Sequence, residues 1–191
     1  MFNKIALGEQ FQGPSVFERQ YPVVVRFVQH LAYNRGLNSA WDRIKDPSPF
    51  WASTTDGHLK LATIVWCNVF SSYKGDLHWT KTPAGNTVEQ AREGFRFRVL
   101  SKTGFPQERW EDYHKKMLSM RDKYVAHLDV KDPMTTAVPL FDTALQVAYA
   151  YDEWVRDLTE PVIWEQPTLI SKYEQFKAEA SSIVTRQPLL P

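Results

Sequence analysis

Features typical of secreted, membrane and disulfide-linked proteins are almost entirely missing from this sequence. A single cysteine, Cys67, excludes an internal disulfide and a thiolate zinc cluster. There is no run of about eighteen apolar residues, which excludes a membrane span. The first residues lack the long apolar core of a signal peptide. We therefore expect a protein of the reducing cytoplasm, without membrane contact.

The sequence also lacks a strong excess of positive or negative residues, and it lacks long flexible tracts. Lys plus Arg number 23 and Asp plus Glu number 22, so no net field indicates a nucleic-acid or membrane surface. Eight glycines and no low-complexity tract argue against a disordered or repetitive chain. Aromatic residues, in contrast, reach 14% and include seven Trp, so we expect a globular domain with a bulky core.

Apolar residues recur at helical spacing along most of the chain and nowhere alternate as in a strand. The first helix is expected from a cap at Ser15, with its start close to Pro22, to a break at Gly36 and Asn38. A short amphipathic piece follows over 41–44, then a proline-rich loop over 46–50. Further helices are expected over 57–73, 87–104, 107–129, 139–158 and 168–180, with a capping box at Thr87. The prediction is all-α: residues 1–191 form a single helical bundle of five or six helices.

The segment from Met120 to Asp129 carries the strongest functional signal. It reads Met-Arg-Asp-Lys-Tyr-Val-Ala-His-Leu-Asp, so Arg121 is followed directly by Asp122 and, after five intervening residues, by His127. This string resembles the signature of the HEPN superfamily (higher eukaryotes and prokaryotes nucleotide-binding), especially its abortive-infection type. The resemblance implies a HEPN-like helical bundle that cleaves RNA without metal or cofactor. It also implies a homodimer, a defence or toxin-like setting, and an antitoxin or another protein as partner.

The resemblance assigns a role to each motif residue. His127 would be the general acid/base, which removes the 2′-hydroxyl proton of RNA or protonates the leaving 5′-oxygen. Arg121 would hold the non-bridging phosphate oxygens and stabilise the charge of the transition state. Asp122 would orient one of the other two residues. The products would end in a 2′,3′-cyclic phosphate.

The spacing alone is a weak signal, because chance gives about one match in a chain of this composition. Arg109 and His114 form a second match, but the residue after Arg109 is Trp110 where the family has a polar residue. On an undistorted helix Arg121 and His127 lie roughly 120° apart. They converge only if the helix loosens near its end or if two motif helices pair across a dimer axis. His114, seven residues before Arg121, lies on the same side of the helix and is an accessory candidate.

Non-catalytic alternatives remain open. The motif pair can be a solvated or locally hydrogen-bonded pair, and the bundle can be a scaffold, or an RNA-binding protein that does not cut. Four cations on one predicted helix are candidates for RNA contact or for a solvated helix face: Arg92, Arg96, Arg98 and Lys102. A binding module predicts a concave aromatic cleft away from Arg121.

Metal binding and thiol chemistry are not expected. His58 and His78 lack the spacing of helical metal ligands, so we predict no metal site. His30 is expected at the edge of the core or on the surface. Cys67 lies in an apolar helix, where a buried structural thiol is expected.

Overall fold

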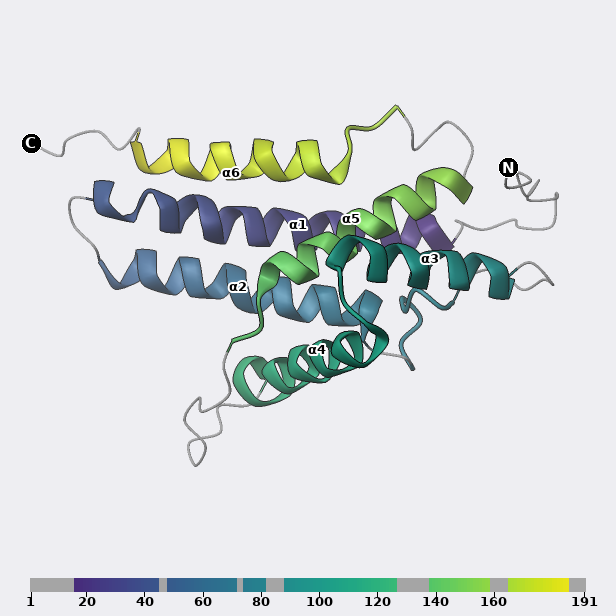
Figure 1. Ribbon diagram of the computed structural model, residues 1–191. Helices are drawn as coiled ribbons and strands as arrows, with labels where there is room; N and C mark the ends of the chain where they lie inside the picture. The colour runs from purple at the N-terminus through teal and green to yellow at the C-terminus, as the bar shows by residue number, and fades with distance from the viewer. Residues whose placement is uncertain are drawn as a thin grey trace, which may run out of the picture.

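The computed structural model describes residues 16–44, 48–71, 74–81, 88–126, 138–158 and 165–185. Within these ranges all regular structure is helical, which confirms the predicted all-α bundle of five or six helices (Figure 1). The elements are α1 (Val16–Ser39), the 3₁₀ turn η1 (Trp41–Arg43), α2 (Pro49–Phe70), α3 (Val88–Thr103), α4 (Gln107–Met120), the π-helical turn η2 (Arg121–Ala126), α5 (Phe141–Leu158) and α6 (Leu169–Thr185). None of these described helices is long and apolar enough to cross a bilayer.

Helix α1 lies at the centre of the bundle, with α2 along one side and α6 along the other (Figure 1). Helix α5 crosses α1 diagonally, and α3 packs on α5. Helix α4 lies against α2, and η2 continues α4 along the same neighbour. This arrangement brings α2, α3, α4 and the segment 74–81 together on one side of the core.

The core is aromatic, as the composition predicts. Trp66, Phe70 and Tyr151 are at most 2% exposed, and they belong to α2 and α5. Phe95 of α3 lies between them and Trp154, and the centroid of its ring is 5.1 Å from that of the Trp154 ring. Large aromatic side chains therefore join α2, α3 and α5 into one continuous apolar layer.

The predicted break at Gly36 and Asn38 is wrong, because α1 continues through both to Ser39. A Cβ at Gly36 would lie 2.5 Å from the Lys177 carbonyl oxygen and 2.8 Å from the Ala180 Cβ. Gly36 is thus a point of close approach between α1 and α6, and it serves packing, not helix termination. Pro22 also lies inside α1 and not at its start, with its ring on the exposed face.

Helix α2 begins at Pro49, eight residues earlier than predicted. Residues 49 and 50 are therefore helical, and the prediction that they belong to the loop over 46–50 is wrong. Proline suits the first helical position because its missing N–H would have no intrahelical partner there. The predicted stop of α3 is confirmed: Gly104 follows the helix with φ 64°, a conformation that favours glycine. Ser15 and Thr87, the predicted caps of two helices, lie outside the described residues.

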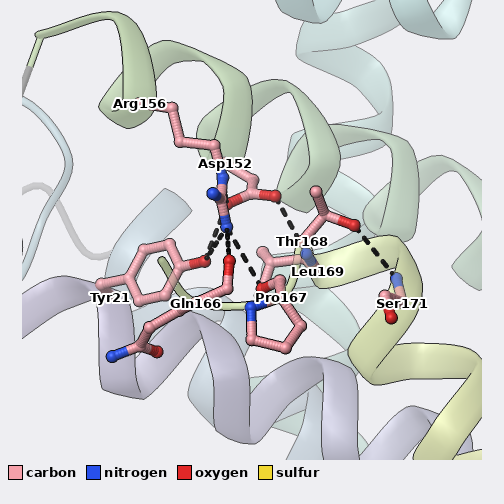
Figure 2. A network of polar contacts seen from close by, with 8 residues as sticks. All are labelled: Tyr21, Asp152, Arg156, Gln166, Pro167, Thr168, Leu169 and Ser171. Carbon is pink, nitrogen blue, oxygen red and sulfur yellow. Dashed lines mark hydrogen bonds and ion pairs between the residues drawn. The ribbon is translucent and has the colours of Figure 1, made fainter. Parts of the chain in front are cut away.

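A buried carboxylate, Asp152 of α5, fixes where α6 begins (Figure 2). Its Oδ2 accepts a hydrogen bond of 2.9 Å from the backbone N–H of Leu169, the first residue of α6. Its Oδ1 accepts from the Tyr21 hydroxyl at 2.7 Å and from Arg156 Nε at 2.8 Å. Arg156 also donates to the carbonyls of Gln166 and Pro167, each at 3.1 Å.

The Asp152 cluster joins α1, α5 and α6 through charge-assisted hydrogen bonds (Figure 2). A negative charge at the N-terminus of α6 is favourable because the first helical N–H groups lack intrahelical acceptors. Burial and the neighbouring carboxylate raise the pKa of Tyr21 above its usual range, so its hydroxyl stays protonated and donates. We interpret this cluster as structural, because its donors and acceptors form hydrogen bonds with other parts of the chain.

Candidate functional site

The predicted motif begins at the point where α4 becomes π-helical. Arg121 is the first residue of this turn, and its Nε and Nη2 both lie 2.7 Å from Asp122 Oδ1. The Arg121 side chain is 26% exposed and that of Asp122 is 57% exposed. Asp122 therefore contacts the guanidinium through two of its nitrogens, and solvent still reaches the pair. Turns of this type are rare and occur frequently at functional sites.

The inner side of the motif rests on α2. Cys67 is fully buried there, and its Sγ lies 3.8 Å from the carbonyl of Met117. Burial raises the pKa of the Cys67 thiol to about 12, although the nearby charge of Arg121 acts in the opposite direction. Cys67 is thus buried and protonated at neutral pH, which is the structural role predicted for it.

Apolar residues at helical spacing form a buried stripe on the described part of α4. Tyr113, Met117 and Met120 are buried, and Trp110 is half-buried. His127, the predicted general acid/base, lies outside the described residues. Its position relative to Arg121 stays a prediction, as does its catalytic role.

The basic residues predicted as RNA contacts are engaged by carboxylates. Arg92 and Arg96 pair with Glu89 of the same helix, at 3.5 and 2.8 Å. Two further pairs join α3 to α5: Arg98 with Asp157, and Lys102 with Glu153. RNA phosphates would have to compete with these carboxylates, although exposed ion pairs of this kind contribute only about 0–1 kcal/mol each. RNA contact by this helix remains a prediction.

His114 lies elsewhere, in a pocket of about 360 Å³ between α2, α3, α4 and the segment 74–81. Four aromatic side chains line it: Phe70, Trp79, Phe95 and Trp110. Its polar lining includes Arg96 from α3 and Lys115 from α4. His114 precedes Arg121 by seven residues, so the pocket lies about 10 Å from Arg121 along the helix axis. This is the concave aromatic site expected of a binding module.

Two histidines of the pocket are held neutral. Burial, followed by the positive charges around it, lowers the pKa of His78 to about 4. Burial also lowers the pKa of His114, although its bond to Phe70 acts in the opposite direction. His114 Nε2 lies 2.9 Å from the Phe70 carbonyl oxygen, which only accepts, so Nε2 carries the proton. Nδ1 of His114 is then an acceptor.

A third feature is a histidine pair between α1 and α2. Nδ1 of His30 lies 3.0 Å from Nδ1 of His58, and both rings are half-buried. This places His30 at the edge of the core, as predicted. Within the described ranges, no group of three or more His, Cys, Asp or Glu side chains gathers as a metal site would require.

The outward face of α4 is polar. Its exposed residues in the described part are Gln107, Glu108, Arg109, Glu111, Asp112, Lys115 and Lys116. The large apolar side chains that are exposed in the described ranges lie on other elements, such as Phe97 of α3 and Leu140. A homodimer through the motif helix would therefore depend on polar contacts over the described length of α4.

The pocket is not recognisable as a unit in the sequence. Ser71, Trp79 and Lys115 come from separate segments, and only packing brings them together. The one signal in the sequence was the aromatic content, which does not show which rings share a cavity.

Comparison with known proteins gives no relative: no family model, no curated protein and no solved structure matches the chain. The resemblance to the HEPN superfamily therefore rests on the motif residues alone.

Proposed function

We propose that the protein is a metal-independent endoribonuclease of HEPN type that acts in a defence or toxin-like setting. The observation that carries the proposal is the arrangement at Arg121. Its guanidinium is held by Asp122 at the start of a π-helical turn and remains partly exposed. An accessible Arg that is oriented by a neighbouring carboxylate suits a group that must hold a phosphate.

The proposed reaction needs no external nucleophile. The 2′-oxygen of a ribose forms a bond to the adjacent phosphorus, and the bond from phosphorus to the 5′-oxygen breaks. His127 takes the 2′-hydroxyl proton or gives a proton to the leaving 5′-oxygen, and Arg121 stabilises the extra negative charge. Asp122 acts through Arg121. The products are a 2′,3′-cyclic phosphate and a free 5′-hydroxyl.

The proposal includes a homodimer, because on one regular helix Arg121 and His127 would lie about 120° apart. Two motif helices across a two-fold axis would place the Arg of one chain near the His of the other. An antitoxin or another protein partner would restrain such an enzyme. Both partners belong to the proposal and rest on the resemblance of the motif.

A second candidate function is non-catalytic binding. It is favoured by the aromatic pocket, which is formed without Arg121 and lies about two helical turns from it. In that case the Arg121–Asp122 pair would serve only to end α4.

The test is RNA cleavage by purified protein in EDTA, with the variants Arg121→Ala and His127→Ala. General acid/base groups contribute about 10²- to 10⁴-fold, and charge-stabilising groups about 10²- to 10³-fold. We expect each variant to lose at least about 10²-fold in rate, and the wild-type products to carry cyclic phosphate. Arg109→Ala is the matched control: Arg109 belongs to the second match of the spacing and lies over the Phe105 ring, 4.3 Å from its centroid.

Circular dichroism must show that the variants fold. Cleavage that persists in both motif variants would contradict the assignment of the site. Absence of cleavage by the wild-type protein over RNAs of varied sequence would favour the non-catalytic candidate.

A further inference from the structure

The pocket beside α4 has the size and lining of a ligand site, and the proposed RNA cleavage does not use it. Its volume of about 360 Å³ lies at the lower end of the usual range for small-molecule sites, about 300–1,000 Å³. Trp79 and Phe95 form one wall, with ring centroids 4.8 Å apart. Phe70 and Trp110 line it from α2 and α4. A pocket with aromatic walls favours a flat, apolar ring as its ligand.

The pocket also holds polar groups that the fold leaves available. The Ser71 hydroxyl is buried and has no oxygen or nitrogen partner among the residues that the structure describes. It interacts with the Cys67 thiol, which is a weak hydrogen-bonding group. A buried hydroxyl without a full partner is costly, and a ligand in the pocket could satisfy it. His114 is fixed by its bond to the Phe70 carbonyl and offers Nδ1 as an acceptor.

The charges at the pocket favour an anion. Arg96 lies over the Trp79 ring, 5.6 Å from its centroid, and Glu89 holds it there at 2.8 Å. Lys115 makes no ion pair with any residue in the described ranges. Glu111 is the one carboxylate among the described lining residues. Glu89 is shared with Arg92, so Arg92, Arg96 and Lys115 stand against Glu89 and Glu111, which leaves one positive charge in excess beside the aromatic walls.

We infer that this pocket binds a small planar ring compound that carries one anionic group, a carboxylate or a phosphate. The ring lies among Trp79, Phe95 and Trp110, and the anionic group lies toward Arg96 and Lys115. The inference goes beyond the proposed RNA cleavage, because it requires neither Arg121 nor His127. It also stands if the protein cleaves no RNA.

Isothermal titration calorimetry with four naphthalene probes tests this inference on the full chain. The probes share one ring system and differ in charge: 1-naphthylacetate, 1-naphthyl phosphate, the neutral 1-naphthylacetamide and the cationic 1-naphthylmethylamine. We expect at least one anion to bind about tenfold or more tightly than the amine. The tighter of the two anions identifies the anionic group.

Variants locate the site. Leu100 lines the pocket and is half-buried, so Leu100→Trp should fill the cavity and abolish binding of all probes. Leu100→Phe provides a milder filling if the Trp variant does not fold. Lys115→Gln and Arg96→Gln should each weaken the anions by about two- to fivefold and leave the amide unchanged. Lys116→Gln is the matched control, because Lys116 pairs with Asp112 and does not line the pocket.

Three results would overturn the inference. They are equal affinity for the amine and the two anions, full binding by a folded pocket-filling variant, and no binding of any probe at about 1 mM. None of these results bears on RNA cleavage, which is measured with Arg121 and His127 variants.

Discussion

The contact at Gly36 makes a quantitative prediction about how α1 and α6 hold together. A methyl group at this position would lie 2.5 Å from the backbone oxygen of Lys177, whereas ordinary contact begins near 3.4 Å. Gly36→Ala therefore requires α6 to move away by about 0.9 Å. The displacement would open a small buried cluster that includes Leu37 and Val184.

Two opposing effects set the magnitude. Replacing Gly by Ala inside a helix gains about 1 kcal/mol of helix propensity. Forcing an extra methyl into a packed interface costs about 1–3 kcal/mol. At Gly36 the two effects combine to a loss of about 0–2 kcal/mol. At Gly94, inside α3, an added Cβ meets no heavy atom of the described residues within 4 Å, so only the gain applies.

Urea unfolding followed by circular dichroism measures both variants. We expect Gly94→Ala to be about 1–3 kcal/mol more stable than Gly36→Ala, a difference that isolates the packing cost. In a chain of this length that corresponds to about 2–4 °C of melting temperature per kcal/mol. If Gly36→Ala were as stabilising as Gly94→Ala, the close approach of α1 and α6 would be refuted.

Two further predictions concern the buried polar groups. Asp152→Ala leaves Arg156 and the first N–H of α6 without their acceptor, so we expect a loss of about 3–5 kcal/mol in urea unfolding. Asp157→Ala, which removes an exposed partner of Arg98, should cost less than about 1 kcal/mol, and equal losses would contradict the structural role of Asp152. His78 has a pKa of about 4 when folded and 6.5 as a reference, so the unfolded state binds more protons between these values. Stability is then complete above pH 6.5 and falls by about 2 kcal/mol as the pH drops to about 5. The decline should be smaller in His78→Gln, and an unchanged pH profile of that variant would refute the assignment.

Much of the helical structure follows from local sequence. Tyr113, Met117 and Met120 recur at helical spacing, and all three are buried in α4. Gly104 stops α3 because its backbone adopts a positive φ, which other residues rarely do. Pro49 also has a local meaning, because proline suits the first position of a helix, although the prolines around it are equally typical of a loop.

One candidate site is formed by neighbouring residues of the sequence, and the other is formed by segments that are far apart in it. Arg121 and Asp122 are adjacent in the sequence, so their pairing needs only one helical turn. The pocket, in contrast, takes its walls from four segments. Whether Arg96 faces a cavity and Arg98 faces α5 depends on how α3 is rotated against its neighbours. Burial of Phe95 and Val99 sets that rotation. The local sequence pattern alone does not show against which neighbouring helices these two residues pack.

Helical periodicity, the stop of α3 and the residues of the motif can be read from the sequence, because periodicity, turn residues and adjacency are local properties. Three other features emerge only when the helices pack: Gly36 is a contact point, the basic residues of α3 are paired, and His114 opens into an aromatic pocket. Each of these depends on contacts between segments far apart in the chain, and such contacts form only when the apolar faces of several helices are buried together.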